Sequence, residues 1–138
     1  MTINIKLKEK TFNRLLDKVL LKKAKKDLLE SENLHIVWFQ DTVNPALSPC
    51  PTVVCKTRED AELFIKKYKN PYGYHVFAEP VELDRLLKLF IENTVWSLCG
   101  MSFLIADNET ESYLDAVLSV KDVKNVLNKK MRLKTLRQ

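Results

Sequence analysis

Glycine is scarce in this chain: only Gly73 and Gly100 occur among its 138 residues. Loops that cradle phosphate groups, and the tight turns of nucleotide-binding folds, require several glycines at fixed spacing. The composition therefore argues against a nucleotide-binding fold.

Long hydrophobic runs are also missing. The longest nearly uncharged stretch, residues 94–106, is shorter than the roughly 20 residues that a membrane-spanning helix needs, and it contains two serines. Residues 1–10 alternate apolar with polar residues and lack the continuous apolar region of a secretory signal peptide. We therefore expect a cytoplasmic protein without a membrane-spanning segment.

The three cysteines are an odd number for a disulfide framework, and reduced thiols in a cytoplasm are the simplest interpretation. A structural zinc site usually combines two close pairs of ligands. Here the spacing from Cys50 to Cys55 is loose, and no second pair accompanies them. The remaining candidate ligands are isolated: His35, His75 and Cys99. We expect no metal and no cofactor.

No catalytic motif is recognisable. A nucleophilic cysteine needs a base within hydrogen-bond reach, and the sequence does not pair any cysteine with a histidine. Glu79, Glu82 and Asp84 surround a predicted helix start, where acidic residues favour the helix dipole. The sequence therefore favours a non-enzymatic protein. An enzyme would require Cys50 or Cys99 beside His35 or His75 in a cleft.

Helical patterns alternate along the chain with short apolar runs rich in β-branched and aromatic residues, which is typical of one sheet covered by helices. We predict a single domain over residues 1–138, with an α+β (or α/β) fold. Its single mixed β-sheet has about five strands, covered by about four helices. Interior strands are expected at residues 34–40, 52–56, 74–78 and 101–106. Residues 113–118 are compatible with a strand or a helix, and we favour an edge strand.

The predicted helices begin at recognisable caps. Thr57 followed by Asp60, and Ser119 followed by Asp122, have capping-box spacing. Pro80 suits the first turn of another helix, and the chain from Asn93 to Gly100 is expected to be a connector. The helices after Thr57 and Pro80 are possible crossovers between parallel strands, and residues 132–138 are expected to fray.

The N-terminal region is predicted to hold two elements. Alternation over residues 3–8 indicates a short strand. Thr11 then caps a helix whose apolar residues recur at helical spacing: Phe12, Leu15, Leu16, Val19, Leu20, Ala24 and Leu28. Such a face, flanked by lysines, also suits a membrane surface, but a sheet needs the same pattern. We therefore expect this face to cover the sheet.

The middle of the chain resembles the SseB-like domain, the bacterial type III secretion enhancer family. TVVCKTREDAELFIKKY (residues 52–68) is similar to its strand, threonine cap and "E-x-A-x-x-F" helix, and residues 81–93 and 99–108 resemble its next helix and strand. The resemblance covers about residues 34–120 and implies a fold and a bacterial cytoplasmic setting, with no catalytic residues. Ala106, Asp107 and Asn108 replace the family's asparagine-proline ending, and the basic N-terminal helix lies outside its pattern.

Charge is strongly segregated along the chain. Residues 1–30 carry +5 and residues 121–138 carry +6, whereas residues 31–120 carry −6. The basic terminal helices offer a possible partner-binding face: Lys22, Lys23, Lys25, Lys26, Lys129, Lys130 and Arg132. Solvated helix faces would explain this pattern without any partner.

Two functional interpretations follow from the charges. The first is a protein-interaction module, whose partner is acidic or is a second copy offering its acidic middle to these basic ends. The second is a nucleic-acid-associated accessory protein that uses the seven basic residues. Arginines are few and no aromatic residue is interleaved among the lysines to stack on bases. We therefore expect the interaction module, with no membrane and no small-molecule substrate.

Overall fold

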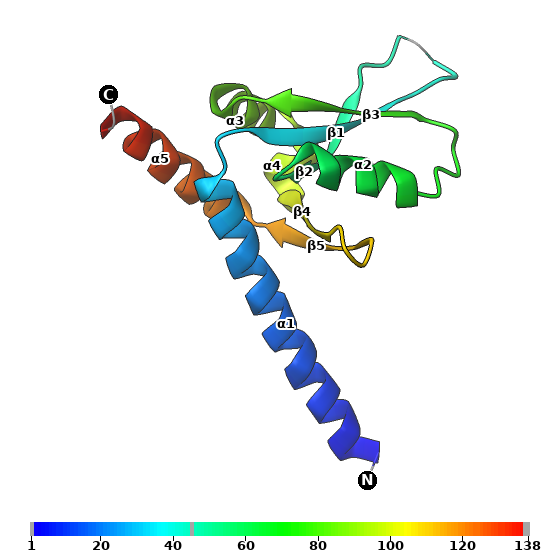
Figure 1. Ribbon diagram of the computed structural model, residues 1–138, viewed down its shortest axis with the longest axis vertical. Coiled ribbons are helices and arrows are strands. Elements are labelled where there is room, and N and C mark those ends of the chain that lie inside the picture. Colours follow the sequence, from blue (N-terminus) through cyan, green and yellow to red (C-terminus); the bar gives the residue numbers. More distant parts are fainter. Residues whose placement is uncertain (1, 45, 137–138) are drawn as a thin grey trace.

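Helices and strands alternate along most of this α+β chain (Figure 1). The computed structural model describes the backbone of residues 2–44 and 46–136, and within α1 it describes side chains from Leu16 onward. In chain order the elements are α1 (Thr2–Glu30), β1 (Leu34–Gln40), β2 (Cys50–Cys55), α2 (Arg58–Lys67), β3 (His75–Val81), α3 (Leu83–Glu92), α4 (Thr94–Cys99), β4 (Met101–Asp107), β5 (Ser112–Leu118) and α5 (Val120–Leu136).

The five strands form one mixed sheet in the order β3-β1-β2-β4-β5. β2 and β4 pair in parallel, and the other neighbours pair antiparallel. β2, β3 and β4 therefore all run in the same direction. The connection through α2 and the connection through α3 and α4 are thus both crossovers between parallel strands, as the sequence predicted.

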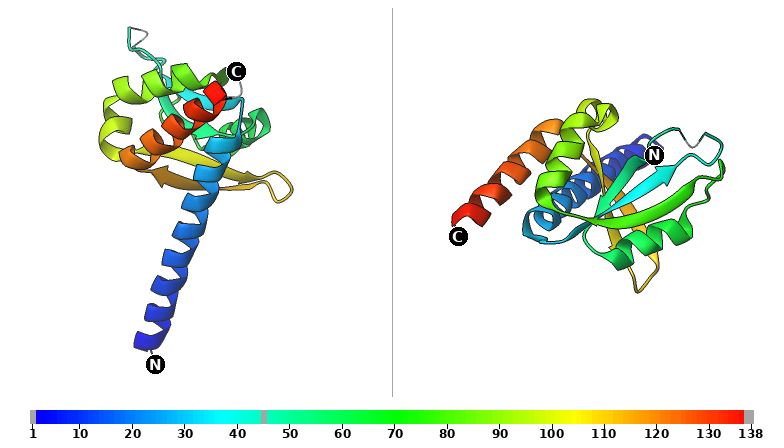
Figure 2. Two further views of the ribbon diagram at one scale, coloured as in Figure 1. Left: turned by 90° about the vertical axis from the view of Figure 1, so that its left-hand side faces the viewer. Right: turned by 90° about the horizontal axis from the view of Figure 1, so that it is seen from above.

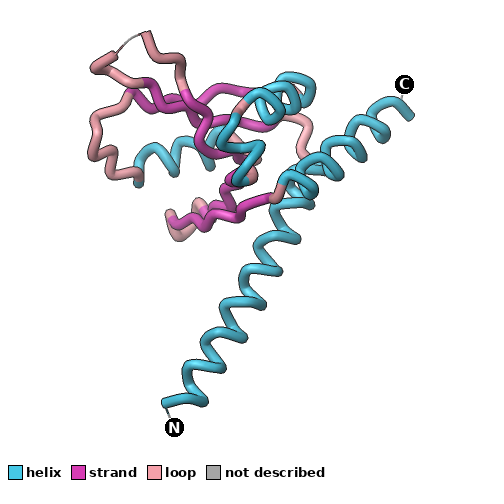
Figure 3. The backbone as a smooth tube through the Cα atoms, turned by 180° about the vertical axis from the view of Figure 1, so that it is seen from behind, coloured by secondary structure: helices cyan, strands magenta, loops and turns pink. Residues whose placement is uncertain are grey.

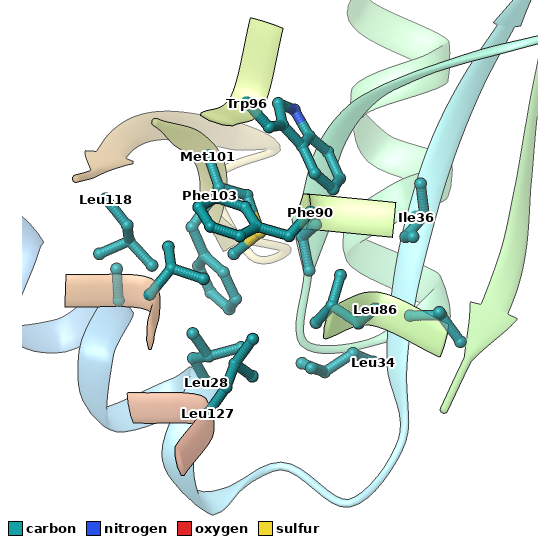
Figure 4. Packing of buried hydrophobic residues seen from close by; sticks show 14 of the residues in the cluster. Leu28, Leu34, Ile36, Leu86, Phe90, Trp96, Met101, Phe103, Leu118 and Leu127 are labelled. Carbon is teal, nitrogen blue, oxygen red and sulfur yellow. The ribbon is translucent and has the colours of Figure 1, made fainter. Parts of the chain in front are cut away.

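Side chains alternate between the two faces of the sheet because successive residues of a strand point in opposite directions. On β1, Ile36 and Trp38 belong to the core cluster under α1, α3, α4 and α5, whereas Val37 belongs to the cluster under α2. Figure 2 shows α2 and α5 on opposite sides of the sheet. The larger cluster contains the fully buried Phe90 and Phe103 (Figure 4).

The helix caps predicted at Thr57 and Ser119 are confirmed, whereas the cap predicted at Thr11 is wrong because this residue lies inside α1, and Pro80 lies in β3 and not in the first turn of a helix. The Thr57 hydroxyl accepts a hydrogen bond from the Asp60 amide at 3.1 Å, and the Ser119 hydroxyl accepts one from the Asp122 amide at the same distance. Each bond satisfies one of the amide groups that the first turn of a helix leaves without an intrahelical partner.

The strand predicted over residues 3–8 is wrong, because α1 already begins at Thr2. None of the five strands of the sheet pairs with this segment in the described structure. Extending an existing helix adds one hydrogen bond for each residue fixed, which a lone strand without a partner does not gain. The alternation over so few residues was therefore a weaker signal than continuity with the helix.

The segment expected as a connector contains the short helix α4, so five helices are described instead of about four. The Asn93 side chain caps it by accepting a hydrogen bond from the Trp96 amide at 2.8 Å, and Trp96 is buried. A helix of six residues is too short to show a helical period in the sequence.

Two further boundaries differ from the prediction. β3 is an edge strand instead of an interior one, and it contains Pro80 opposite His35. Proline is tolerated at a sheet edge because it has no amide proton to donate. α5 continues to Leu136, beyond the expected fraying point at residue 132, while residues 137–138 lie outside the described chain.

Candidate interaction surface

The N-terminal half of α1 projects away from the rest of the protein. α1 packs against β4, β5 and α5 through its C-terminal half and then projects away from the sheet (Figures 1 and 3). Ala24 and Leu28 are fully buried there, with Leu20 and Leu21 partly buried beside them. No other described element covers the projecting half.

Two exposed apolar side chains mark the start of that projecting half. Leu16 is 37% exposed and Val19 is 63% exposed. Val19 precedes Leu28 by nine residues, which is about two and a half helical turns, so the two lie on opposite sides of α1. The expectation that one apolar face of this helix covers the sheet is therefore wrong for Leu16 and Val19.

The helix thus carries two sets of apolar residues on different sides. Leu21, Ala24 and Leu28 follow helical spacing on the side that meets the sheet. Phe12, Leu15, Leu16 and Val19 follow the same spacing along the sequence, but the described members of this second set face solvent. The angular offset between the two sets was the signal in the sequence that distinguishes them.

Three of the seven predicted basic residues make contacts within the chain. Lys23 lies 3.0 Å from the Asp27 carboxylate, and Lys25 lies 3.2 Å from that of Asp122. The second pair joins α1 to α5. Burial acts to raise the pKa of Asp122, but hydrogen bonds from Lys25 and Ser119 outweigh it and lower that pKa below its ordinary value.

Lys130 binds backbone carbonyl groups at the C-terminal end of α1. Its ammonium group donates to the Leu28 carbonyl oxygen at 2.9 Å and to the Ser31 carbonyl oxygen. These bonds satisfy carbonyl groups at a helix C-terminus, where a positive charge also favours the helix dipole. Burial lowers the pKa of Lys130, and the Glu32 carboxylate opposes that shift.

The other four predicted residues are exposed: Lys22, Lys26, Lys129 and Arg132. The two helices that carry them meet at the C-terminal half of α1, and their far ends point in different directions (Figure 1). The basic residues therefore surround a crossing of two helices and do not follow one straight groove.

An acidic groove of about 770 Å³ lies beside this crossing. It is formed by the end of α1 and the loop after it, by the start of α3, and by α5. Four of its lining residues are acidic: Glu30, Glu32, Glu82 and Asp84. Leu29, Leu83 and Leu133 supply apolar surface, and Lys130 and Lys134 are its lysines. Lys130 already donates hydrogen bonds to backbone carbonyl groups. The four acidic side chains therefore give the groove a negative character.

A smaller hollow of about 450 Å³ lies at the carboxyl ends of β2 and β4, a place where parallel sheets often bind ligands. Here Asn108 donates a hydrogen bond to Asp60 at 2.9 Å, which ties the β4–β5 turn to the start of α2. Lys23 forms an ion pair with Asp27 in the same hollow, which Lys56 and Glu59 also line. The contacts described within it join parts of the fold to one another.

The buried cysteine, Cys55, is poorly suited to nucleophilic chemistry. Cys55 is buried opposite His35 in the β1–β2 register, and its thiol is within hydrogen-bonding distance of the backbone carbonyls of His35 and Thr57. Burial raises the pKa of Cys55 to about 12, with a smaller contribution from the Asp60 charge. Such a thiol is almost entirely protonated at neutral pH and is a poor nucleophile. In the described part of the chain, no cluster of three or more candidate ligand side chains could hold a metal ion.

The thiols provide a direct check of this geometry. Cys50 and Cys99 are exposed, whereas Cys55 is fully buried. We expect two thiols of the folded protein to react rapidly with Ellman's reagent at pH 8, and the third to react only after unfolding in urea. Absorbance at 412 nm counts them. Rapid reaction of all three thiols in the native protein would contradict the burial of Cys55.

No protein-family model, curated protein or solved structure matches this chain. The resemblance to the SseB-like domain therefore stays a prediction. No helix within residues 2–44 and 46–136 is both long enough and apolar enough to cross a membrane.

Proposed function

We propose that this protein is a non-enzymatic protein-interaction module that works in a bacterial cytoplasm and binds through the projecting half of α1. The exposure of Leu16 and Val19 on the side of α1 away from the sheet carries the proposal. Exposed apolar side chains that follow helical spacing are typical of a helix that docks onto a partner. The cytoplasmic setting is supported by three free cysteines, and the bacterial setting by the SseB-like resemblance.

A charge introduced into the apolar stripe tests this function. The protein and its Val19→Glu variant are immobilised and exposed to a bacterial lysate, with Val95→Glu as the control. Val95 on α4 is 65% exposed, close to the value for Val19. We expect the wild type and the Val95 variant to retain the same proteins, and Val19→Glu to lose them. Identical retention by all three proteins would refute binding through this stripe.

The exposed basic residues favour nucleic acid as the second candidate. Each phosphate contact contributes a slope of about −0.9 to the dependence of log K on log salt concentration for duplex DNA. Lys22, Lys26, Lys129 and Arg132 are exposed, and four such contacts predict a slope of about −3.6.

Titration of labelled duplex and single-stranded DNA and RNA at several salt concentrations measures this slope. The Lys22→Gln, Lys26→Gln double variant is expected to bind more weakly and with a shallower slope. Absence of binding at 50 mM salt would eliminate the nucleic-acid candidate and leave the protein-interaction module.

A further inference from the structure

We propose that the free edge of β5 binds an extended segment of a partner protein, which pairs with β5 and continues the sheet. The segment carries a lysine or arginine opposite Asp115 and apolar residues on both sides of it. β5 is the last strand in the sheet order, and β4 is its neighbour on one side (Figure 1). This surface is distinct from the exposed Leu16 and Val19 side chains of α1, so the inference goes beyond the proposed function.

The backbone of β5 offers hydrogen-bonding groups that an extended chain can satisfy together. In an antiparallel pair, alternate residues of a strand direct their N–H and C=O groups toward the neighbour, and the residues between them direct these groups away. The outward groups of β5 have no hydrogen-bond partner in the described part of the chain. A further strand beside them would extend the hydrogen-bond ladder, as in other complexes that add a strand to a sheet edge.

β5 lacks the features by which edge strands usually avoid such pairing. Proteins protect their sheet edges with prolines, lysines, bulges or very short strands. β5 has seven residues, contains neither proline nor lysine, and pairs with β4 without a shift in register. The opposite edge strand of the sheet, β3, contains Pro80. β5 is therefore the edge of this sheet that can accept a further strand.

Apolar side chains are exposed on both faces of β5. Leu114 is 51% exposed and is paired with Ile105, which packs against the larger core cluster. Val117 is 61% exposed and follows Leu114 by three residues, so it points to the other face. Strands buried on both faces carry apolar residues on both, as interior strands do. β5 thus has the side chains of an interior strand at the edge of the sheet, and a neighbouring strand would cover them.

Asp115 specifies the charge of the segment. It is paired with Leu104, which belongs to the core cluster under α2. Partial burial raises the pKa of the Asp115 carboxyl group, and no lysine or arginine among the described side chains forms an ion pair with it. Side chains directly opposite each other on paired strands have Cβ atoms about 4.5–5.5 Å apart, so a basic residue there would pair with this carboxylate.

A second copy of this chain fits the edge less well than a single segment. Two antiparallel β5 strands would be related by a twofold axis perpendicular to the sheet, which keeps the same face of both sheets on the same side. α1 packs against β4 and β5 on one face and extends past the β5 edge (Figures 1 and 2). The projecting half of each α1 would then lie over the other copy's sheet, on the face that its own α1 already covers.

A fluorescein-labelled peptide with the sequence Thr-Val-Ile-Lys-Ile-Val-Thr tests the inference. Its sequence reads the same in both directions, so it suits parallel and antiparallel pairing. Fluorescence anisotropy with the purified full-length protein should show one-to-one binding with a dissociation constant of about 100 µM or lower, as expected for a small interface. Leu114→Lys should weaken binding at least about tenfold, because a lysine protects a strand edge. Val95→Lys, at a comparably exposed apolar position on α4, should bind like the wild type.

A charge exchange tests the residue opposite Asp115. Asp115→Lys should weaken binding of this peptide by about fivefold or more, because it replaces an attractive cross-strand pair with a repulsive one. The same variant should prefer a peptide with glutamate in place of the central lysine. Circular dichroism and urea denaturation check that each variant folds.

N-methylated peptides identify backbone pairing without any change in the protein. One form is methylated at both isoleucine amides, and the other at the lysine amide and both valine amides. Alternate amides of the bound segment face β5 and the others face away. Only one of the two forms should therefore lose binding.

Three outcomes would overturn the inference: no binding of the peptide, equal binding of both methylated forms, or wild-type binding by Leu114→Lys. Binding that is insensitive to Asp115→Lys would overturn the basic residue of the segment. A wild type that dimerises in sedimentation and becomes monomeric in Leu114→Lys would assign the edge to a second copy instead. Val19→Glu should bind the peptide like the wild type. A protein that binds no peptide but retains lysate partners through Val19 would refute the β5 edge alone and leave the interaction module.

Discussion

Replacement of Gly100 by alanine is expected to lower the free energy of unfolding by about 3 kcal/mol or more. Gly100 has φ = +90° and ψ = 174°, a conformation that is essentially restricted to glycine and costs other residues about 1–3 kcal/mol. A β-carbon at this position would also collide with the Leu118 carbonyl oxygen on β5. Crowding of this kind typically costs a further 1–3 kcal/mol. Urea denaturation measures the loss.

The other glycine provides the control. Gly73 also has a positive φ, at +66°, but a β-carbon there would meet no atom within 4 Å. Gly73→Ala should therefore cost only the conformational term, about 1–2 kcal/mol. The difference between the two variants isolates the close approach of Gly100 to β5. Equal losses would show that the chain does not need this contact.

The general architecture could be predicted because its signals are local. Apolar β-branched runs predicted the positions of β1 to β4 and of the edge strand β5, and capping residues predicted the starts of α2 and α5. The crossovers followed from helices between strands. Each of these features depends on residues close together in the sequence.

The features that could not be predicted depend on contacts distant in sequence. β3 is as rich in apolar residues as an interior strand, and its one edge signal, Pro80, was assigned to the start of the following helix. The acidic groove combines residues from α1, α3 and α5. Its formation depends on how the helices cross, which no single segment encodes.

The contacts of the basic residues could not be predicted for the same reason. The sequence correctly located the two positive regions, but it could not separate lysines with internal partners from lysines exposed to solvent. Lys130 lies about one hundred residues from the carbonyl groups that it binds at the end of α1. Only the folded structure brings Lys130 and these carbonyl groups together. This structural contact could not be predicted from the charge of Lys130.

Truncation to alanine is expected to affect stability strongly in one apolar stripe of α1 and weakly in the other. Leu28→Ala should lower the free energy of unfolding by about 2–5 kcal/mol, because Leu28 is fully buried in the larger core cluster and its truncation leaves a cavity. Leu16→Ala should change it by less than about 0.5 kcal/mol, because Leu16 is 37% exposed. Both values are measured by urea denaturation.

The same two variants separate stability from association. In the lysate experiment, the immobilised Leu16→Ala variant should retain less of the bound protein than the wild type, although its fold is as stable. Leu28→Ala should retain association at temperatures where it stays folded, because Leu28 faces the sheet and not the partner. A large loss of stability from Leu16→Ala would mean that this residue belongs to the core. The N-terminal half of α1 would then be a structural helix, and its exposed stripe would no longer require a partner.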